Sequence, residues 1–209
     1  MYNNVVIICD GAFPKTEYPR YLIRTADFII CCDGALKKFL RASAAIFGGQ
    51  RLPDRIIGDM DSISAADKKK YSDIIVQVDE QEHNDQTKAF RWVMENLKDV
   101  CNIYILGATG QREDHTIGNI SLLMEYMRMG AEVRSYTDYG VFIPCKGTCT
   151  FECREGQQVS IFNFTAKGLK EKGLAYPIYD FTSWWQGTLN KCTDTSFTIE
   201  AEGEYLVFL

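Results

Sequence analysis

The chain of 209 residues carries 28 acidic and 23 basic side chains, which gives a formal net charge of −5 at pH 7. A mildly acidic chain lacks the basic face that broad binding to nucleic acid or anionic membranes requires, so neither partner is predicted. Apolar residues make up 46% of the chain, enough for a sizeable core, and the length allows one large domain or two small ones.

The chain contains no segment typical of a membrane or secreted protein. No apolar run approaches the roughly 18 residues of a membrane span, and the first residues carry no basic segment of the kind that opens a signal peptide. The eight cysteines include no Cys-x-x-Cys spacing. We therefore expect reduced thiols in a cytoplasmic protein.

The first two thirds of the chain alternate short apolar runs with helical patterns. Runs typical of strands buried on both faces lie at residues 5–9, 28–32, 55–57, 74–78, 103–106 and 132–136. Two apolar stripes at helical spacing are formed by Phe90, Val93, Met94 and Leu97 and by Ile117, Ile120, Met124 and Met127. Ser64 is a predicted helix N-cap. This alternation predicts an α/β domain with a mostly parallel sheet over residues 1–137.

The remaining residues, 138–209, have no helical periodicity. Short β-rich runs lie at 141–144, 148–153, 159–164, 197–201 and 205–209. Turn signals separate them at Lys146-Gly147, Glu155-Gly156, Lys167-Gly168 and Glu202-Gly203. We predict a small all-β domain, either a sandwich or a barrel.

Acidic side chains follow most of the predicted parallel strands. Because ligands bind beyond the carboxyl ends of such strands, these residues are candidates for a site: Asp10, Asp33, Asp59, Asp61, Asp85 and Asp114. Asp59-x-Asp61 can direct two carboxylates at one hard cation, and Mg²⁺ takes oxygen ligands that it often shares with phosphates. An ordinary acidic turn is the alternative for Asp59-x-Asp61 alone, and Asp85 on a neighbouring loop favours the metal.

The loop at residues 107–115 has features of a phosphate site. Gly107 and Gly110 allow a close approach of backbone N–H groups, and Arg112 supplies a planar donor fork. Lys88, near the start of a helix, could add a second cation, although solvated charges are the alternative for Arg112 and Lys88. From these residues alone we predict a Mg²⁺-dependent enzyme acting on a nucleotide or another phosphate ester. The acceptor stays open.

At these motifs the sequence resembles the thiamine pyrophosphokinase (thiamine diphosphokinase) family. The resemblance is carried by Asp33-Gly34-Ala35, Gly58-Asp59-Met60-Asp61-Ser62, Asp85-Gln86-Thr87-Lys88, residues 107–115, Gly173-Leu174-Ala175-Tyr176-Pro177-Ile178 and Gly187-Thr188-Leu189-Asn190. Two positions depart from the usual family pattern. Ala108 stands where a second glycine is usual, and Leu189 stands where serine often precedes Asn190.

The resemblance implies transfer of the pyrophosphoryl group of ATP to the hydroxyl of thiamine, with release of AMP. It implies Asp59, Asp61 and Asp85 as Mg²⁺ ligands, and these three with Arg112 and Asp114 as catalytic residues. The residues expected to contact ATP are Asp33, Thr87, Lys88, Gly107, Gly110, Arg112 and His115.

The resemblance also implies a thiamine site built partly from the β-rich region. The candidates are Gln81, Trp184, Trp185, Thr188 and Asn190. Aromatic faces suit a cationic thiazolium, although β-domain core is the alternative for most aromatic residues of 176–185. We also expect a homodimer whose β-domain helps to build the thiamine pocket. The competing hypotheses are a Mg²⁺-dependent phosphohydrolase with an Asp nucleophile and a non-catalytic thiamine- or nucleotide-binding protein.

Overall fold

The computed structural model describes residues 2–209 and divides into two compact units. Unit 1 runs up to Leu122 and includes Gly130–Tyr139, whereas unit 2 comprises Leu123–Met129 and Gly140–Leu209. None of the helices between residues 2 and 209 has the length and apolar character that crossing a bilayer would require.

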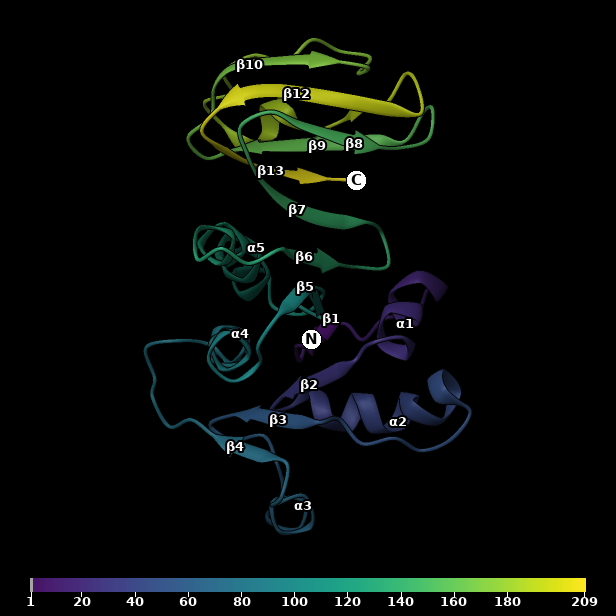
Figure 1. Cartoon of the computed structure of the whole chain (residues 1–209), viewed down its shortest axis with the longest axis vertical. Helices are drawn as coiled ribbons and strands as arrows, with labels where there is room; N and C mark the ends of the chain where they lie inside the picture. The colour runs from purple at the N-terminus through teal and green to yellow at the C-terminus, as the bar shows by residue number, and fades with distance from the viewer. Residues whose placement is uncertain (1) are drawn as a thin grey trace. The chain divides into compact units, whose positions relative to one another are not determined.

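Unit 1 contains a parallel sheet with the strand order β6-β5-β1-β2-β3-β4 (Figure 1). Its strands are β1 Tyr2–Ile8, β2 Phe28–Cys32, β3 Arg55–Gly58, β4 Ile75–Gln77, β5 Val100–Leu106 and β6 Val133–Tyr136. Its helices are α1 Glu17–Arg24, α2 Ala35–Phe47, α3 Ala65–Lys70, α4 Asp85–Asn96 and the first part of α5 Glu113–Arg128. Ile7 of the central strand β1 pairs with Ile30 on one side and Ile105 on the other.

Helices cover both faces of this sheet. In Figure 1, α1 and α2 lie on one side of the strands, and α4 with the start of α5 lies on the other. Residues 5–8 of β1 are completely buried, as the continuous apolar run predicts for a strand covered on both faces. The parallel α/β domain is therefore confirmed.

Local signals in unit 1 are confirmed to different degrees. Ser64 caps α3, where its side chain accepts a hydrogen bond from the backbone N–H of Asp67. The stripe predicted from Ile117 to Met127 is only partly right, because Ile117 is 57% exposed and the buried residues of α5 are Leu123, Met124 and Tyr126. The spacing alone did not identify the buried face.

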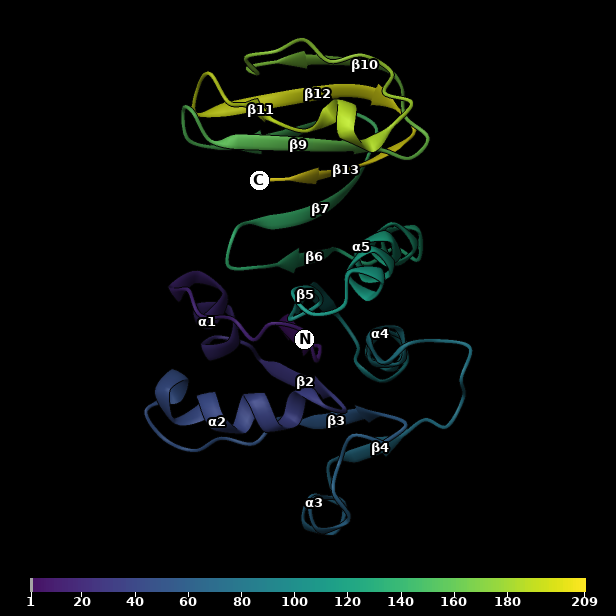
Figure 2. The ribbon, with the colours of Figure 1, turned by 180° about the vertical axis from the view of Figure 1, so that it is seen from behind.

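Unit 2 is a sandwich of two antiparallel sheets (Figure 2). One has the order β11-β9-β13-β7 and the other β10-β12-β8. The strands are β7 Val141–Lys146, β8 Cys149–Glu152, β9 Gln158–Asn163, β10 Lys167–Lys172, β11 Asn190–Lys191, β12 Ser196–Glu202 and β13 Glu204–Phe208. The short helix η1 Trp184–Gly187 packs against β9. Ile161 and Val207 from one sheet share a buried cluster with Phe197 and Ile199 from the other, which confirms the all-β prediction.

The turn predicted at Lys167-Gly168 is wrong. These residues begin β10, and the pairing with β12 shifts register between Lys167 and Lys170. Gly168 has a φ of 66°, which an irregular pair can accommodate within a strand. The glycine therefore marks a β-bulge.

Candidate active site

A cavity of about 550 Å³ lies within unit 1 at the carboxyl ends of the parallel strands. Its walls come from the residues that follow β1, β3 and β5, from the last residue of β2, from the segment that leads into α4 and the start of that helix, and from α5. Of the predicted site residues, the cavity is lined by Asp10, Asp59, Gln81, Asp85, Lys88, Gly107, Arg112 and His115. The sheet topology therefore brings both the carboxylates and the cations of the prediction into one site.

Three carboxylates converge beside this cavity. Oxygen atoms of Asp33, Asp59 and Asp85 lie within 4.8 Å of one another. Asp33 is only 2% exposed, and its Oδ1 atom has no hydrogen-bond partner among residues 2–209. Its Oδ2 atom accepts a hydrogen bond from the backbone N–H of Ser62 at 3.0 Å. A buried carboxylate oxygen without a donor, beside two further carboxylates, is a donor set that fits a divalent cation.

The electrostatics of the cluster point in the same direction. Burial raises the pKa of Asp33 and of Asp85, and the negative charge of the neighbouring carboxylates adds to this effect. A hydrogen bond from Ser62 opposes the rise in the pKa of Asp33, and the positive charge of Lys88 opposes the rise in the pKa of Asp85. The backbone N–H of Asp61, which donates to Asp59 Oδ1 at 3.1 Å, holds the pKa of Asp59 below its usual value. Crowded carboxylates of this kind are stabilised in their charged form when a cation lies among them.

The loop after β3 is shaped by two residues. Met60 is completely buried and has a left-handed backbone with a φ of 68°, a conformation that its apolar neighbours Leu36 and Ile63 hold in place. Gly58 permits a close approach, because a Cβ atom there would lie 2.9 Å from Asp33 Cβ and 3.1 Å from Asp85 Cγ. The sequence of this loop therefore determines how closely the carboxylates of Asp33 and Asp85 can approach it.

The cavity is also lined by two cationic side chains, Arg112 and Lys88. Arg112 makes a two-pronged contact with Asp114, with Nε 3.1 Å from Oδ1 and Nη2 2.6 Å from Oδ2, and this contact lowers the pKa of Asp114 to about 2. Lys88 is 5% exposed, and its Nζ lies 3.5 Å from Asp85 Oδ1. Lys88 is therefore a buried partner of the carboxylate cluster and not a solvated surface charge.

The structure separates some predicted residues from the cavity. Within the described part of the chain, the predicted residues of unit 1 that do not line it are Asp33, Asp61, Thr87, Gly110 and Asp114. Asp33 lies against it through the carboxylate cluster, whereas Asp61 is exposed and lies outside that cluster. The roles of these residues stay predictions.

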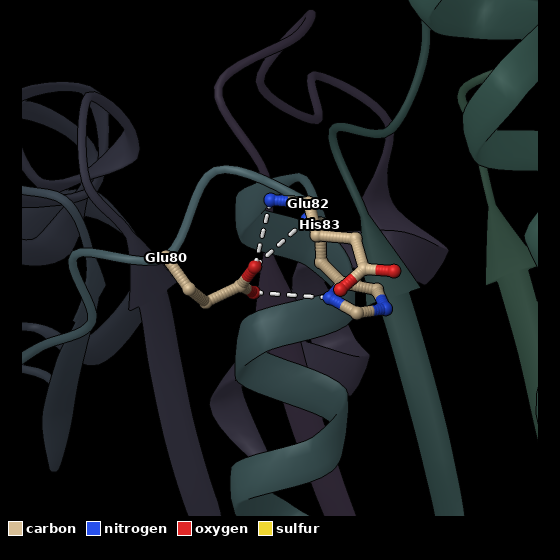
Figure 3. Close-up of side chains that lie close together, drawn as sticks. All are labelled: Glu80, Glu82 and His83. Atoms are coloured by element: carbon tan, nitrogen blue, oxygen red, sulfur yellow. Dashed lines mark hydrogen bonds and ion pairs between the residues drawn. The ribbon is translucent and has the colours of Figure 1, made fainter.

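The sequence reasoning did not single out Glu80, Glu82 and His83, which lie close together in the segment before α4 (Figure 3). Glu80 Oε2 accepts hydrogen bonds from the backbone N–H groups of Glu82 and His83, at 2.8 and 3.1 Å, and Glu80 Oε1 lies 3.1 Å from His83 Nδ1. Glu82 and His83 line the cavity. The sequence signal that could have identified this group is the presence of three ionisable residues within four positions.

Lys38 of α2 and Asn119 of α5 were also missed. Lys38 Nζ contacts Asp10 Oδ1 and donates to the backbone carbonyls of Asp10 and Gly11, at 2.7, 2.7 and 2.9 Å. Asn119 lines the cavity and lies one helical turn after His115, a spacing that could have identified it. Both residues hold loops that form the cavity wall.

Comparison with known families accounts for both units. The sequence model described as "Thiamin pyrophosphokinase, catalytic domain" matches residues 19–134, more than half of the chain. The model described as "Thiamin pyrophosphokinase, substrate-binding domain" matches residues 140–208. The chain belongs to the thiamin pyrophosphokinase family. The cavity lies in the catalytic part of this family member, and the β sandwich corresponds to the substrate-binding part.

Individual relatives agree with this assignment. Thiamine pyrophosphokinase 3 from Oryza sativa subsp. japonica is 31% identical over 125 residues, which are 50% of this chain and 46% of the rice protein. Thiamine pyrophosphokinase from Bacillus subtilis (strain 168) is 31% identical over 87 residues, which are 40% of each chain. The matches thus span less than half of the length of these curated relatives.

Solved structures of the family share the fold over nearly the whole chain. A Bacillus subtilis thiamine pyrophosphokinase superposes with a TM-score of 0.78 at 21% identity and covers 99% of this chain and 97% of its own. Thiamin pyrophosphokinase from Candida albicans gives a TM-score of 0.79 at 20% identity, over 99% of this chain and 88% of its own. At these identities the likeness supports the fold.

Four of the predicted thiamine-binding residues of this thiamin pyrophosphokinase family member lie in unit 2, and their surroundings differ. Trp185 is 74% exposed, whereas Trp184 packs against Phe162 and Phe164, and its Nε1 donates to the carbonyl of Asn163 at 3.2 Å. The Thr188 hydroxyl donates to the carbonyl of Trp185 at 2.8 Å.

Asn190 is buried, and its amide bonds to the main chain of Tyr176 and Lys191. In the structure, Asn190 thus ties together the segment around β11. Trp185 has the most surface available to a ligand, and a role in thiamine binding stays a prediction for all four residues.

Proposed function

We propose that this protein transfers the pyrophosphoryl group of ATP to the hydroxyl of thiamine, giving thiamine diphosphate and AMP. The observation that carries the proposal is the carboxylate cluster of Asp33, Asp59 and Asp85 beside a cavity that Arg112 and Lys88 also line, in a thiamin pyrophosphokinase catalytic domain. Carboxylates that hold a cation, next to fixed positive charge, suit the transfer of a phosphate-containing group.

In this proposal the carboxylate cluster holds Mg²⁺. Asp33, Asp59 and Asp85 are the closest set, and Asp61 on the same loop as Asp59 is retained as a further ligand. A Mg²⁺ ion held by these residues would neutralise part of the charge on the triphosphate. Lys88, held against Asp85, adds a buried positive charge beside the same oxygens.

The opposite wall of the cavity would bind the triphosphate. Arg112 offers a planar donor fork whose orientation is set by Asp114, and Gly107 and His115 lie alongside it. We retain Thr87 and Gly110 as ATP contacts on the neighbouring loops. In a loose transition state, this alignment and charge neutralisation matter more than a dedicated base.

Thiamine binding is assigned to Gln81 in the cavity and to Trp184, Trp185, Thr188 and Asn190 of the substrate-binding domain. Gln81 lies near Asp59 and helps to lower the pKa of that carboxyl. The exposed face of Trp185 suits a cationic thiazolium ring. We further propose a homodimer, because the exposed aromatic residues Tyr176, Tyr179 and Trp185 and the strand edges of the β sandwich would be protected by a second copy.

The test is one assay with purified protein, thiamine, ATP and Mg²⁺, in which AMP and thiamine diphosphate are measured together. We expect equal amounts of both products, and only when thiamine, ATP and Mg²⁺ are all added to the protein. Chelation of Mg²⁺ should stop the reaction, and restored Mg²⁺ should recover it.

Two other outcomes would contradict the proposal. Release of phosphate from a phosphate ester without thiamine would indicate a phosphohydrolase with an Asp nucleophile. Tight binding of thiamine or ATP without turnover would indicate a non-catalytic binding protein.

A further inference from the structure

Asn119 connects the two halves of the cavity through hydrogen bonds. Its Oδ1 accepts a hydrogen bond from Asn84 Nδ2 at 2.8 Å, and its Nδ2 donates to the carbonyl of Ala108 at 2.8 Å. Its own backbone carbonyl accepts a hydrogen bond from Gln86 Nε2 at 3.0 Å. One residue of α5 thus contacts both the segment that begins α4 and the loop that follows β5.

The direction of these hydrogen bonds is dictated by the backbone groups at the two ends. The N–H of Thr87 can only donate, so Asn84 Oδ1 must face it, at 3.0 Å, and the Asn84 NH₂ group faces Asn119. The carbonyl of Ala108 can only accept, so the Asn119 NH₂ group must face it. Both amides therefore have one orientation, and they form a continuous relay from the first turn of α4 to the loop after β5.

At its α4 end, the relay involves the residues on both sides of Asp85. Asp85 is flanked by Asn84 and Gln86. Asn84 bonds to the side chain of Asn119, and Gln86 bonds to the main-chain carbonyl of Asn119. Gln86 is 3% exposed, and its Oε1 also accepts a contact from the Cys9 thiol at 3.5 Å. The backbone on both sides of Asp85 is thus tied to α5.

The other end of the relay is the loop that follows β5, which in the proposed function binds the triphosphate and is called the anion-binding loop. Ala108 is 5% exposed and lies in the loop that carries Gly107 and Arg112. The preceding carbonyl, that of Gly107, accepts a hydrogen bond from the N–H of Gly11 at 2.7 Å. Because this loop packs closely against the chain after β1, a displacement of Ala108 would displace the cavity wall.

We propose that Asn119 is a positioning residue that fixes the spacing between the carboxylate cluster and the anion-binding loop. This inference rests on the proposed function, in which one triphosphate must reach both Asp85 and Arg112. Loss of the relay leaves Asp85 and Arg112 unaltered as residues but allows the distance between the carboxylate cluster and the loop after β5 to vary.

The experiment is a double-mutant cycle on the full chain. Asn84→Ser keeps an N-cap acceptor for α4 but is too short to reach Asn119, and Asn119→Ala removes the relay from the α5 side. The matched control is Asn102→Ala, which removes hydrogen bonds to the carbonyl of Asn3 and the side chain of Asn4 near the start of β5, away from the cavity. Calorimetry with Mg²⁺ and α,β-methylene ATP measures binding without turnover.

We expect each relay variant to raise the dissociation constant about tenfold, the effect of losing one or two net hydrogen bonds. The double variant should bind no more weakly than about twice the weaker single variant, because both substitutions break one relay. The Mg²⁺ concentration for half-maximal binding should rise in parallel, and the melting temperature should fall no further than in Asn102→Ala. Binding in Asn102→Ala should match that of the unsubstituted protein.

Two results would overturn the positioning role. One is binding by both relay variants that equals that of Asn102→Ala. The other is a double variant in which the two losses multiply to about a hundredfold. Production of thiamine diphosphate by the unsubstituted protein is measured separately, so a failure of the proposed function is distinguished from a failure of the relay.

Discussion

Asp33 and Asp85 are carboxyl groups that burial makes harder to ionise, and Asp59 beside them is easier to ionise. The difference arises because burial raises the pKa of Asp33 and Asp85 by more than Ser62 and Lys88 lower it, whereas at Asp59 the backbone N–H of Asp61 outweighs burial. At the residue scale, the cluster is therefore arranged for an added cation and not for internal hydrogen bonding.

The first prediction concerns Asp59→Asn. The amide keeps an oxygen for the backbone N–H of Asp61 but loses the charge, so turnover should fall about 10²-fold or more. The melting temperature should not fall, because one of three mutually repelling carboxylates is neutralised. Turnover as a function of Mg²⁺ concentration and thermal unfolding are the measurements.

Asp73→Asn is the control for this change, because Asp73 is exposed and lies outside the cavity. Its turnover should equal that of the unsubstituted protein. If Asp59→Asn keeps near-normal turnover at limiting Mg²⁺, Asp59 is not a metal ligand.

At the scale of elements, the end of β3 controls how closely the carboxylates pack. Gly58→Ala would place a methyl group 2.9 Å from Asp33 Cβ and 3.1 Å from Asp85 Cγ, so we predict that both side chains move apart. The Mg²⁺ concentration for half-maximal turnover should rise, and overpacking should cost about 1–3 kcal/mol of unfolding free energy.

Gly118→Ala is a suitable control for Gly58→Ala, because a Cβ atom at Gly118 has no neighbour within 4 Å. We expect it to leave the Mg²⁺ dependence unchanged. An equal Mg²⁺ dependence in Gly58→Ala and Gly118→Ala would contradict the role of close packing at β3.

A second prediction at this scale concerns the entry to α1. The Asp138 carboxylate, which follows β6, accepts hydrogen bonds from the N–H groups of Lys15 and Thr16 and from the Thr16 hydroxyl. Burial opposes ionisation, but the N–H groups of Thr16 and Lys15 outweigh it, so the pKa of Asp138 lies below its usual value. A carboxyl with a lowered folded-state pKa stabilises the fold above its unfolded-state pKa of about 3.9.

Asp138→Asn keeps the acceptor oxygen and removes the charge. We predict a loss of about 1 kcal/mol in unfolding free energy at pH 7, and a smaller difference as the pH falls through about 4 toward the lowered pKa. Urea unfolding of both proteins at several pH values measures this difference. A difference that stays constant with pH would show that the charge contributes nothing.

At the scale of the whole molecule, the prediction is a homodimer with shared sites. Asp61→Asn should inactivate the carboxylate side, and the double variant Trp184→Ala/Trp185→Ala should inactivate the proposed thiamine side. When the two inactive proteins are mixed under subunit exchange, some mixed dimers contain one intact site. Part of the activity should therefore return.

Mass measurement in solution accompanies this complementation test. A stable monomer with full activity would contradict the dimer. Failure to recover activity despite demonstrated exchange would contradict a site shared between subunits.

Much of the fold could be predicted because its signals are local. The apolar run around Ile7 indicates a strand covered on both faces, and Ser64 indicates a helix start. Lys167 and Gly168 were misread, because a glycine in a bulge and a glycine in a turn look alike until the partner strand is known.

The sequence by itself determined the fold class, the family motifs and the presence of acidic and basic residues at one edge of a sheet. Only the tertiary structure decided that Asp33 joins Asp59 and Asp85 while Asp61 does not, that Lys88 is buried against Asp85, and that Asn119 spans the cavity. The physical reason is that periodicity and turn chemistry act over a few residues. Convergence of side chains depends instead on strand order and helix packing, which join residues such as Asn84 and Asn119 that are 35 positions apart.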